Sequence, residues 1–271
     1  MDGREIRLER LFGDGRAVVI AIDHGMFDGP LPAMEDLSLT AEHINPIVDA
    51  VLVAPGMIRH VAKIFARPKR PLAMVRLNWN TIYCRKLGYT VGRSSYAYMI
   101  EDALREGVDV ASVSLTLHGD DPDRDATNIE IFTRLTTACH ALGMPVVAEY
   151  FPAGHNRMDR QQLHNNVVLG SRIAAELGAD AIKTLYTHDF KTITSTCPVP
   201  VLGLGAEKLP TQEAALRLAA REIQDGARGV VFGRNAIQVP DPIRFQAALC
   251  DVVKSGMLVE EAVRLYELLE R

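Results

Sequence analysis

Short runs rich in valine, isoleucine and leucine recur eight times along the sequence, and stretches with helical periodicity lie between them. Several runs are apolar at nearly every position, which is typical of parallel strands buried on both faces. We predict strands over residues 17–23, 49–54, 71–77, 108–115, 145–151, 180–186, 199–205 and 228–233. Eight strands alternating with helices over about 250 residues are typical of one barrel. The predicted fold class is α/β, a (β/α)8 TIM barrel.

An open, doubly wound sheet is the alternative architecture. The G-x-G-x-x-G fingerprint of dinucleotide-binding sheets does not follow the first strand, which weakens that alternative. We predict a single domain over residues 1–271, with an extra N-terminal helix over 4–12 that closes the barrel floor. A terminal helix over 259–271 is expected on the outer ring or at a subunit contact. The connection over 78–95 is unusually long, which predicts a lid or a substrate loop.

Composition and charge exclude several classes of function. A formal net charge of −4 argues against nucleic acid as a partner, because phosphate backbones call for a basic face. No apolar run approaches the roughly 20 residues of a membrane span, and the first ten residues are too charged for a secretory signal. The four cysteines form no C-x-x-C pair and are expected to be reduced. We therefore expect a cytoplasmic protein that contacts neither membrane nor nucleic acid.

Lys183 is the most informative candidate, because it alone of the seven lysines falls within a predicted strand. Alternation places it on one face with Ala181 and Leu185, and one face of each strand points into the barrel. Burial among aliphatic walls disfavours the ammonium and frees the amine to attack a carbonyl. This pattern predicts Schiff-base chemistry at Lys183. A structural ion pair with Glu149 or Asp23 is the alternative.

A second group of candidates lies where the seventh and eighth strands end, the usual phosphate site of this fold. Gly205 and Gly233 let backbone N–H groups approach an anion, and Lys208 and Arg234 add positive charge. These four residues predict a phosphorylated substrate. The alternative is that the glycines only form tight turns and that Arg234 pairs with a surface acid.

Asp23 and His24 follow the first predicted strand. Asp23 is predicted to orient the lysine, bind substrate hydroxyls or accept a proton, with an N-cap role as the alternative. His24 is a candidate acid/base or ligand, and a hydrogen-bonded packing residue is its alternative.

The segments "IAIDHG", "ADAIKTLYT" and "GARGVVFGRNAIQVPDP", over residues 17–242, together resemble archaeal-type class I fructose-bisphosphate aldolases of the deoxyribose-phosphate aldolase superfamily. The resemblance implies a Schiff base on Lys183 assisted by Asp23. It also implies a substrate phosphate held by Gly205, Gly233 and Arg234, and a homo-oligomer, often a decamer.

One departure from the family pattern marks an atypical member. The family's W-x-Y-P-R-G motif, whose tyrosine is the general acid/base, corresponds here to "EYFPAG" over 149–154. Phe151 replaces the tyrosine and cannot donate a proton, and Tyr150 is expected to point to the opposite face. Glu149 would share the inward face with Phe151.

We therefore predict that the proton shuttle is Glu149 or a histidine among His24, His118 and His155, of which the last two are also predicted to contact substrate. A purely structural role for Glu149, beside Lys183 or Arg76, is the alternative. The function that these residues favour is a homo-oligomeric carbon–carbon lyase on a phosphorylated keto or aldehyde substrate, without metal or cofactor.

Three alternative functions remain open. The first is a thiolase or transaldolase-like transferase of the same family. The second is a metal-assisted aldolase with ligands among Asp23, His24, His118, Glu149, His155 and His188. The third is a non-catalytic sugar-phosphate-binding protein.

Overall fold

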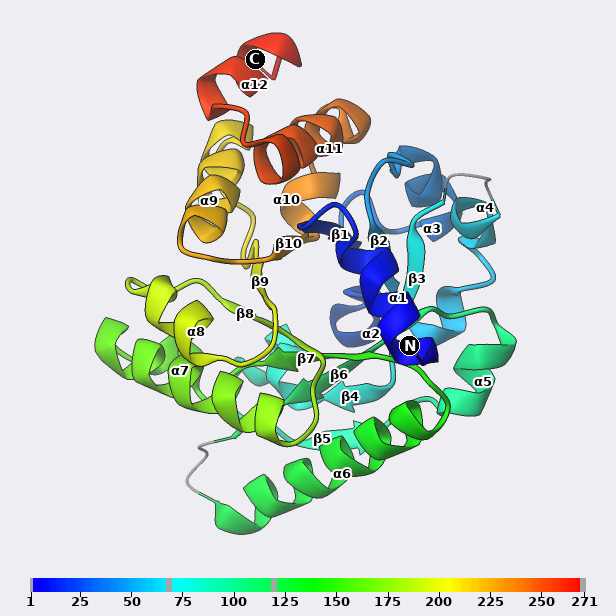
Figure 1. Ribbon diagram of the computed structural model, residues 1–271, viewed down its shortest axis with the longest axis vertical. Helices are drawn as coiled ribbons and strands as arrows, with labels where there is room; N and C mark the ends of the chain where they lie inside the picture. Colours follow the sequence, from blue (N-terminus) through cyan, green and yellow to red (C-terminus); the bar gives the residue numbers. More distant parts are fainter. Residues whose placement is uncertain (1, 67–69, 118–120, 269–271) are drawn as a thin grey trace.

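A computed structural model describes residues 2–66, 70–117 and 121–268 of the chain. Within these ranges eight parallel strands close into a barrel, in the order β1-β10-β9-β8-β7-β6-β3-β2 (Figure 1). The strands are β1 Ala17–Ala21, β2 Ala50–Val53, β3 Leu72–Arg76, β6 Val110–Leu115, β7 Val146–Tyr150, β8 Ala181–Leu185, β9 Val201–Leu204 and β10 Gly229–Phe232. The predicted (β/α)8 barrel is confirmed, and each strand lies within a predicted run. A single domain over 1–271 stays a prediction.

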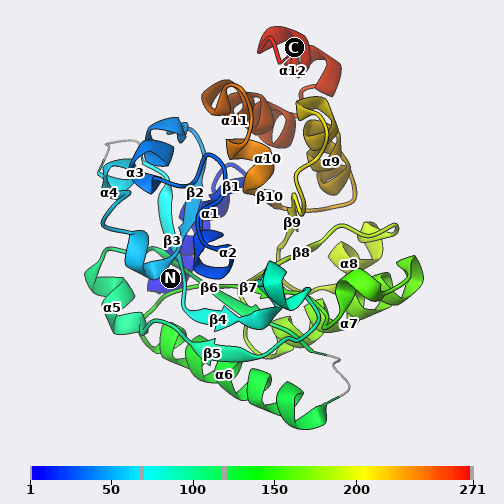
Figure 2. The same ribbon diagram turned by 180° about the vertical axis from the view of Figure 1, so that it is seen from behind.

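Helices surround the strands on the outside in both views (Figures 1 and 2). The α-helices are α1 Gly3–Phe12, α2 Gly25–Asp28, α3 Leu37–Thr40, α4 Ala62–Phe65, α5 Ile100–Arg105, α6 Pro122–Ala141, α7 Arg160–Glu176, α8 Phe190–Thr196, α9 Gln212–Gln224, α10 Arg234–Ile237, α11 Pro242–Cys250 and α12 Val259–Leu265. Short 3-10 turns are η1 Ala41–His43, η2 Pro55–Met57, η3 Thr81–Tyr83, η4 Arg85–Leu87 and η5 His155–Arg157, and Asp251–Ser255 (η6) is a π-helix. No helix in the described ranges is long and apolar enough to cross a bilayer.

The barrel interior changes from apolar to charged along the strands. Val147 and Ala181 belong to an inner apolar cluster. Two residues further along the same strands lie Glu149 and Lys183, which pair in the register between β7 and β8. Because alternate residues of a strand share a face, the charged side chains also point inward. The barrel therefore presents polar chemistry at the carboxyl ends of its strands.

Helix α1 covers the opposite, amino-terminal end of the barrel. Asp2 and Glu5 form a capping box that starts this helix. Leu11 is buried in the inner apolar cluster, and Phe12 packs against it. The Arg7 guanidinium donates a hydrogen bond of 2.8 Å to the Gly143 carbonyl. The predicted helix at the barrel floor is confirmed.

The long connection over 78–95 is an ordered insertion rather than an irregular loop. It contains η3 and η4 between two antiparallel strands, β4 Asn78–Asn80 and β5 Ser94–Tyr96. The Asn80 amide donates to the Ser94 hydroxyl at 2.9 Å. Asn128 of α6 accepts a 2.9 Å hydrogen bond from the Ser94 backbone N–H. These bonds hold the insertion over the end of the barrel.

Candidate active site

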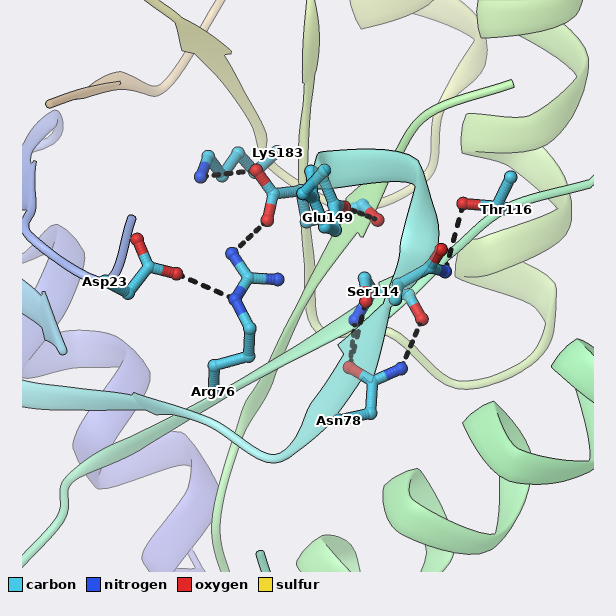
Figure 3. A network of polar contacts seen from close by, with 9 residues as sticks. Asp23, Arg76, Asn78, Ser114, Thr116, Glu149 and Lys183 are labelled. Carbon is cyan, nitrogen blue, oxygen red and sulfur yellow. Dashed lines mark hydrogen bonds and ion pairs between the residues drawn. The ribbon is translucent and has the colours of Figure 1, made fainter. Parts of the chain in front are cut away.

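Lys183 lies inside the barrel with only 7% of its surface exposed. Its Nζ is 2.5 Å from Oε1 of Glu149 on the neighbouring strand (Figure 3). The surroundings are thus not the aliphatic walls that we predicted, because a carboxylate balances the buried amine. The ion pair that we considered as an alternative is present, and a nucleophilic role for Lys183 stays a prediction.

Glu149 connects Lys183 to a second buried cation, since its Oε2 accepts a hydrogen bond from Nη2 of Arg76 (Figure 3). Burial alone would raise the pKa of Glu149, but the charges of Arg76 and Lys183 outweigh it and hold that pKa below its usual range. Glu149 is therefore an ionised carboxylate in contact with the lysine. Its direct contact with the amine, rather than its basicity, places Glu149 to exchange a proton with Lys183.

Arg76, at the end of β3, is 2% exposed and joins the two acids of the site. Its Nε donates to Oδ2 of Asp23 at 2.7 Å. The rings of Phe27 and Tyr83 lie 5.2 and 5.0 Å from the guanidinium carbon. Burial would lower the pKa of Arg76, but the two carboxylates raise it. The buried network thus joins two acidic side chains, Asp23 and Glu149, to two basic ones, Arg76 and Lys183.

Asp23 follows β1 and takes part in this network instead of capping a helix. The N-cap of α2 is His24, so the alternative role of Asp23 is not observed. Burial would raise the pKa of Asp23, but Arg76 and Lys183 lower it. Burial also lowers the pKa of His24, whose Nδ1 has no hydrogen-bond partner among the described residues. His24 is therefore neutral and available for a ligand.

A cavity of about 300 Å³ opens above the network. This volume is at the lower end of the range for small-molecule sites. The predicted site residues that line it are Asp23, His24, Glu149, His155, Lys183, Gly205, Gly233 and Arg234. Lys208 is exposed on the loop after β9 and is not part of the lining. His118 lies outside the described residues.

Arg234 begins α10 at the side of the cavity where β9 and β10 end. Its Nη2 donates to the Ala206 carbonyl at 3.0 Å, and its buried Nε has no partner within the described ranges. Asn235 donates to the carbonyls of Gly205 at 2.7 Å and Glu207 at 2.9 Å. Asn235 therefore shapes the loop after β9, and a free guanidinium N–H remains on Arg234.

Gly233 is required by close packing at the same side. A β-carbon at this position would lie 2.3 Å from Cε1 of His24 and 2.9 Å from the Ala21 carbonyl oxygen. No other residue type fits without displacing His24. Gly233 therefore keeps the imidazole and the end of β10 together.

The family model for DeoC/LacD family aldolases matches residues 17–239. The chain belongs to this aldolase family. One relative is the 3-hydroxy-5-phosphonooxypentane-2,4-dione thiolase of Klebsiella pneumoniae. It is 30% identical to this chain over 268 residues, which cover 98% of this chain and 86% of the relative. An uncharacterized aldolase of Saccharolobus solfataricus is 28% identical over 270 residues, covering 98% and 99%.

The crystal structure of an archaeal fructose 1,6-bisphosphate aldolase is similar to this aldolase, with a TM-score of 0.77 and 25% identity, over 93% of this chain and 99% of the other. The resemblance seen in the sequence is thus confirmed. As a member of this family the protein is an enzyme of the carbon–carbon lyase type.

The faces predicted for "EYFPAG" are confirmed in the aldolase. Phe151 lines the cavity, whereas Tyr150 is buried on the outer side of the barrel against Gly170 of α7. Burial raises the pKa of Tyr150. Tyr150 cannot reach the cavity, so it does not replace the missing family tyrosine.

Tyr83 is a cavity residue of the aldolase that the sequence did not reveal. It lies in η3 of the insertion, and its hydroxyl is 3.5 Å from the backbone carbonyl oxygen of Glu149. Burial raises its pKa well above the usual value. Tyr83 therefore presents a protonated phenol beside the charged network.

The candidate metal ligands that the structure describes, a set that leaves out His118, are not assembled into one cluster. His188 packs against His164, with ring centroids 4.7 Å apart, and is absent from the cavity lining. In the part of the chain that the structure describes, no three His, Cys, Asp or Glu side chains form a group suited to a metal ion.

Proposed function

We propose that the protein is a class I aldolase-type lyase that forms a Schiff base on Lys183 with a phosphorylated keto substrate. The observation that supports this proposal most strongly is the contact of 2.5 Å between the Lys183 amine and Glu149 at the base of the cavity. A buried amine needs a proton acceptor before it can attack a carbonyl, and Glu149 is in place for that role.

In the first step Glu149 takes a proton from Lys183, and the nitrogen lone pair attacks the substrate carbonyl carbon. The carbonyl π electrons move to oxygen, which takes up two protons in turn, the one first removed from the amine and a second one lost by the nitrogen after the attack, and then leaves as water to give an iminium ion. Glu149 can carry both protons from the nitrogen to this oxygen, one after the other. Arg76 keeps Glu149 and Asp23 oriented throughout, because it contacts both carboxylates.

In the second step the iminium draws electrons from the adjacent carbon–carbon bond. A base removes the proton of the β-hydroxyl, an aldehyde leaves, and the bonding pair forms an enamine on the lysine. Protonation of the enamine carbon and hydrolysis then release the ketone and restore the amine. We assign the base to Glu149, because it is ionised and contacts the nitrogen that carries the intermediate.

The phosphate of the substrate is proposed to bind beside Gly205, Gly233 and Arg234. The unpartnered Nε of Arg234 supports this assignment, since a buried guanidinium N–H favours an anionic acceptor. His24 and His155 remain candidate substrate contacts because both line the cavity. Lys208 stays a prediction as a phosphate ligand.

Reductive trapping tests the proposal. The protein is incubated with dihydroxyacetone phosphate and borohydride, and the modified peptide is identified by mass spectrometry. We expect one covalent adduct on Lys183, and none in Lys183→Met. Lys191→Met is the matched control, because Lys191 is exposed on α8 and should leave trapping intact. If a panel of ketose phosphates gives no adduct on Lys183, the Schiff-base mechanism is wrong.

A transfer reaction is the second candidate, because the Klebsiella relative at 30% identity is a thiolase by name. A product that keeps the cleaved fragment on a thiol acceptor would favour this candidate over simple lysis. We also propose a homo-oligomer, which light scattering of the purified protein tests. Activity that survives dialysis against a chelator would count against the metal-assisted alternative.

A further inference from the structure

One wall of the active-site cavity is a continuous row of aromatic rings. Consecutive ring centroids are 4.9, 5.2, 5.2 and 6.1 Å apart. In order, the rings belong to Phe27, Tyr83, Phe151, His155 and Tyr89, and all of them line the cavity. We call these five residues the aromatic wall.

Hydrogen bonds between loops fix the aromatic wall in place. The Asn156 amide donates to the Gly88 carbonyl at 2.9 Å, which joins the turn after β7 to the insertion. The Trp79 indole N–H donates to the Met26 carbonyl at 3.1 Å, which joins the insertion to α2. The wall is therefore a preformed surface.

Tyr83 of the aromatic wall and the proposed phosphate site lie on different sides of the barrel, whereas Tyr89 is close enough to Arg234 for that charge to act on its hydroxyl. Tyr83 and Tyr89 follow β3, whereas Gly205 and Arg234 follow β9 and β10. In the closed strand order, β3 lies opposite β9. A substrate that spans the cavity from Arg234 past Lys183 therefore meets the ring of Tyr83 at its other end.

The charges around the cavity do not favour a second phosphate at that end. Among the described lining residues the lysines and arginines are Arg76, Lys183 and Arg234. Arg76 and Lys183 already contact carboxylates. The remaining ionisable lining residues do not supply a free cation either, since Asp28 and Glu207 are acidic and burial lowers the pKa of His155.

We propose that the substrate carries a single phosphate and that the part facing the aromatic wall is uncharged. This inference rests on the proposed Schiff-base function and specifies its substrate class: a ketose monophosphate, made from a phosphorylated ketone and a neutral aldehyde. In the synthetic direction the enamine carbon attacks the aldehyde carbonyl carbon, and the aldehyde oxygen takes up one proton. A second phosphate would lose its hydration beside the rings without gaining a counter-charge, which is unfavourable.

Fructose 1-phosphate and fructose 1,6-bisphosphate test the inference, because they differ only in the phosphate at the far end. Each is incubated separately, at equal concentration, with enzyme and borohydride, and the initial rate of adduct formation on Lys183 is measured. We expect the monophosphate to react at least tenfold faster. Equal rates, or faster reaction of the bisphosphate, would overturn the inference while leaving Lys183 as the nucleophile. No adduct with either sugar or with dihydroxyacetone phosphate would overturn both proposals.

A cation placed at the far end provides a second measurement. Asn156 is exposed and lines the cavity beside the aromatic wall, so Asn156→Lys should fold and bring an ammonium there. We expect this variant to reduce the preference for the monophosphate several-fold, whereas Asn156→Met, the matched control that also loses the hydrogen bond to Gly88 but adds no charge, keeps it. An unchanged preference in Asn156→Lys would contradict the placement of the far end at the wall.

Discussion

Replacement of Arg76 by methionine tests whether charge balance stabilises the interior of the barrel. The side chain is 2% exposed and contacts both Asp23 and Glu149. Methionine fills much of the volume but leaves two buried carboxylates with Lys183 as their remaining close cation. Loss of one partner of a buried ion pair costs about 3–5 kcal/mol. We expect a loss of this size in the free energy of unfolding at pH 7.

The expected change in melting temperature follows from the length of 271 residues. An unfolding entropy of about 2.1 cal/mol/K per residue gives roughly 0.57 kcal/mol/K for the chain, so Tm should fall by about 5–9 °C. Thermal unfolding followed by circular dichroism measures the shift. Arg59→Met is the control, because the Arg59–Glu106 pair has an arginine that is 82% exposed. Its loss should cost far less than the loss of Arg76, because solvent screens an exposed ion pair.

The stabilisation of the folded protein by Arg76 should depend on pH, because Arg76 pairs with two carboxylates. The folded-state pKa values of Asp23 and Glu149 lie below their ordinary values of 3.8 and 4.5. Their pairing therefore stabilises the native protein above those values, and this stabilisation is lost as the pH falls through the lower folded-state pKa values. The difference between wild type and Arg76→Met should be largest near neutral pH and should narrow below about pH 4. The double variant Arg76→Met/Asp23→Asn should recover part of the loss. A single variant no less stable than Arg59→Met would refute the reasoning.

Three further changes test other parts of the aldolase. Glu149→Gln should lower kcat by about 10²–10⁴-fold in steady-state kinetics, because the proposed proton shuttle is lost. Glu149→Asp should recover part of the rate. A near-normal kcat in Glu149→Gln would contradict the assignment of Glu149 as the proton shuttle. Gly233→Ala should raise KM for phosphorylated substrates by displacing His24, and an unchanged KM would show that this packing does not affect binding. Glu222 is fully buried, its carboxyl oxygens have no hydrogen-bond partner among the described residues, and burial raises its pKa well above 4.5. Because the folded state favours the neutral carboxyl, its contribution to stability is present below pH 4.5 and is lost as the pH rises. Glu222→Met should therefore raise Tm at pH 7, and this gain should shrink at acidic pH. A lower Tm of the variant at both pH values would contradict this prediction.

The strands could be predicted from the sequence because each one carries its own apolar pattern. Alternation within a strand also placed Glu149 and Phe151 on the inward face and Tyr150 on the outward face, as the structure confirms. These are local properties of a few consecutive residues. The barrel, its floor helix and the strand of the candidate lysine could therefore be inferred from the sequence alone.

The surroundings of Lys183 could not be predicted in the same way. The sequence allowed Arg76 and Lys183 as alternative partners of Glu149, but Arg76 follows four apolar residues of β3, and nothing near it in sequence indicates that it also joins Asp23 in the turn after β1. Such pairing depends on closure of the barrel, which brings distant strands together. Tyr83 was missed for a related reason, since the order of the 78–95 insertion comes from contacts with α6 and with the end of β6. Asn78, for example, exchanges hydrogen bonds of 2.8 Å with the Ser114 backbone (Figure 3).

The ordered insertion between β3 and α5 separates two tasks within one enzyme. The lysine and its acids belong to the strand framework, where any change disturbs the core, whereas Tyr83 and Tyr89 belong to a segment that pairs with itself. If the proposed function holds, changes within residues 78–96 would alter the Tyr83 and Tyr89 part of the aromatic wall, and with it the choice of aldehyde, while Lys183 and Glu149 stay unchanged. Grafting that segment between relatives is accordingly a direct way to redesign what the enzyme joins.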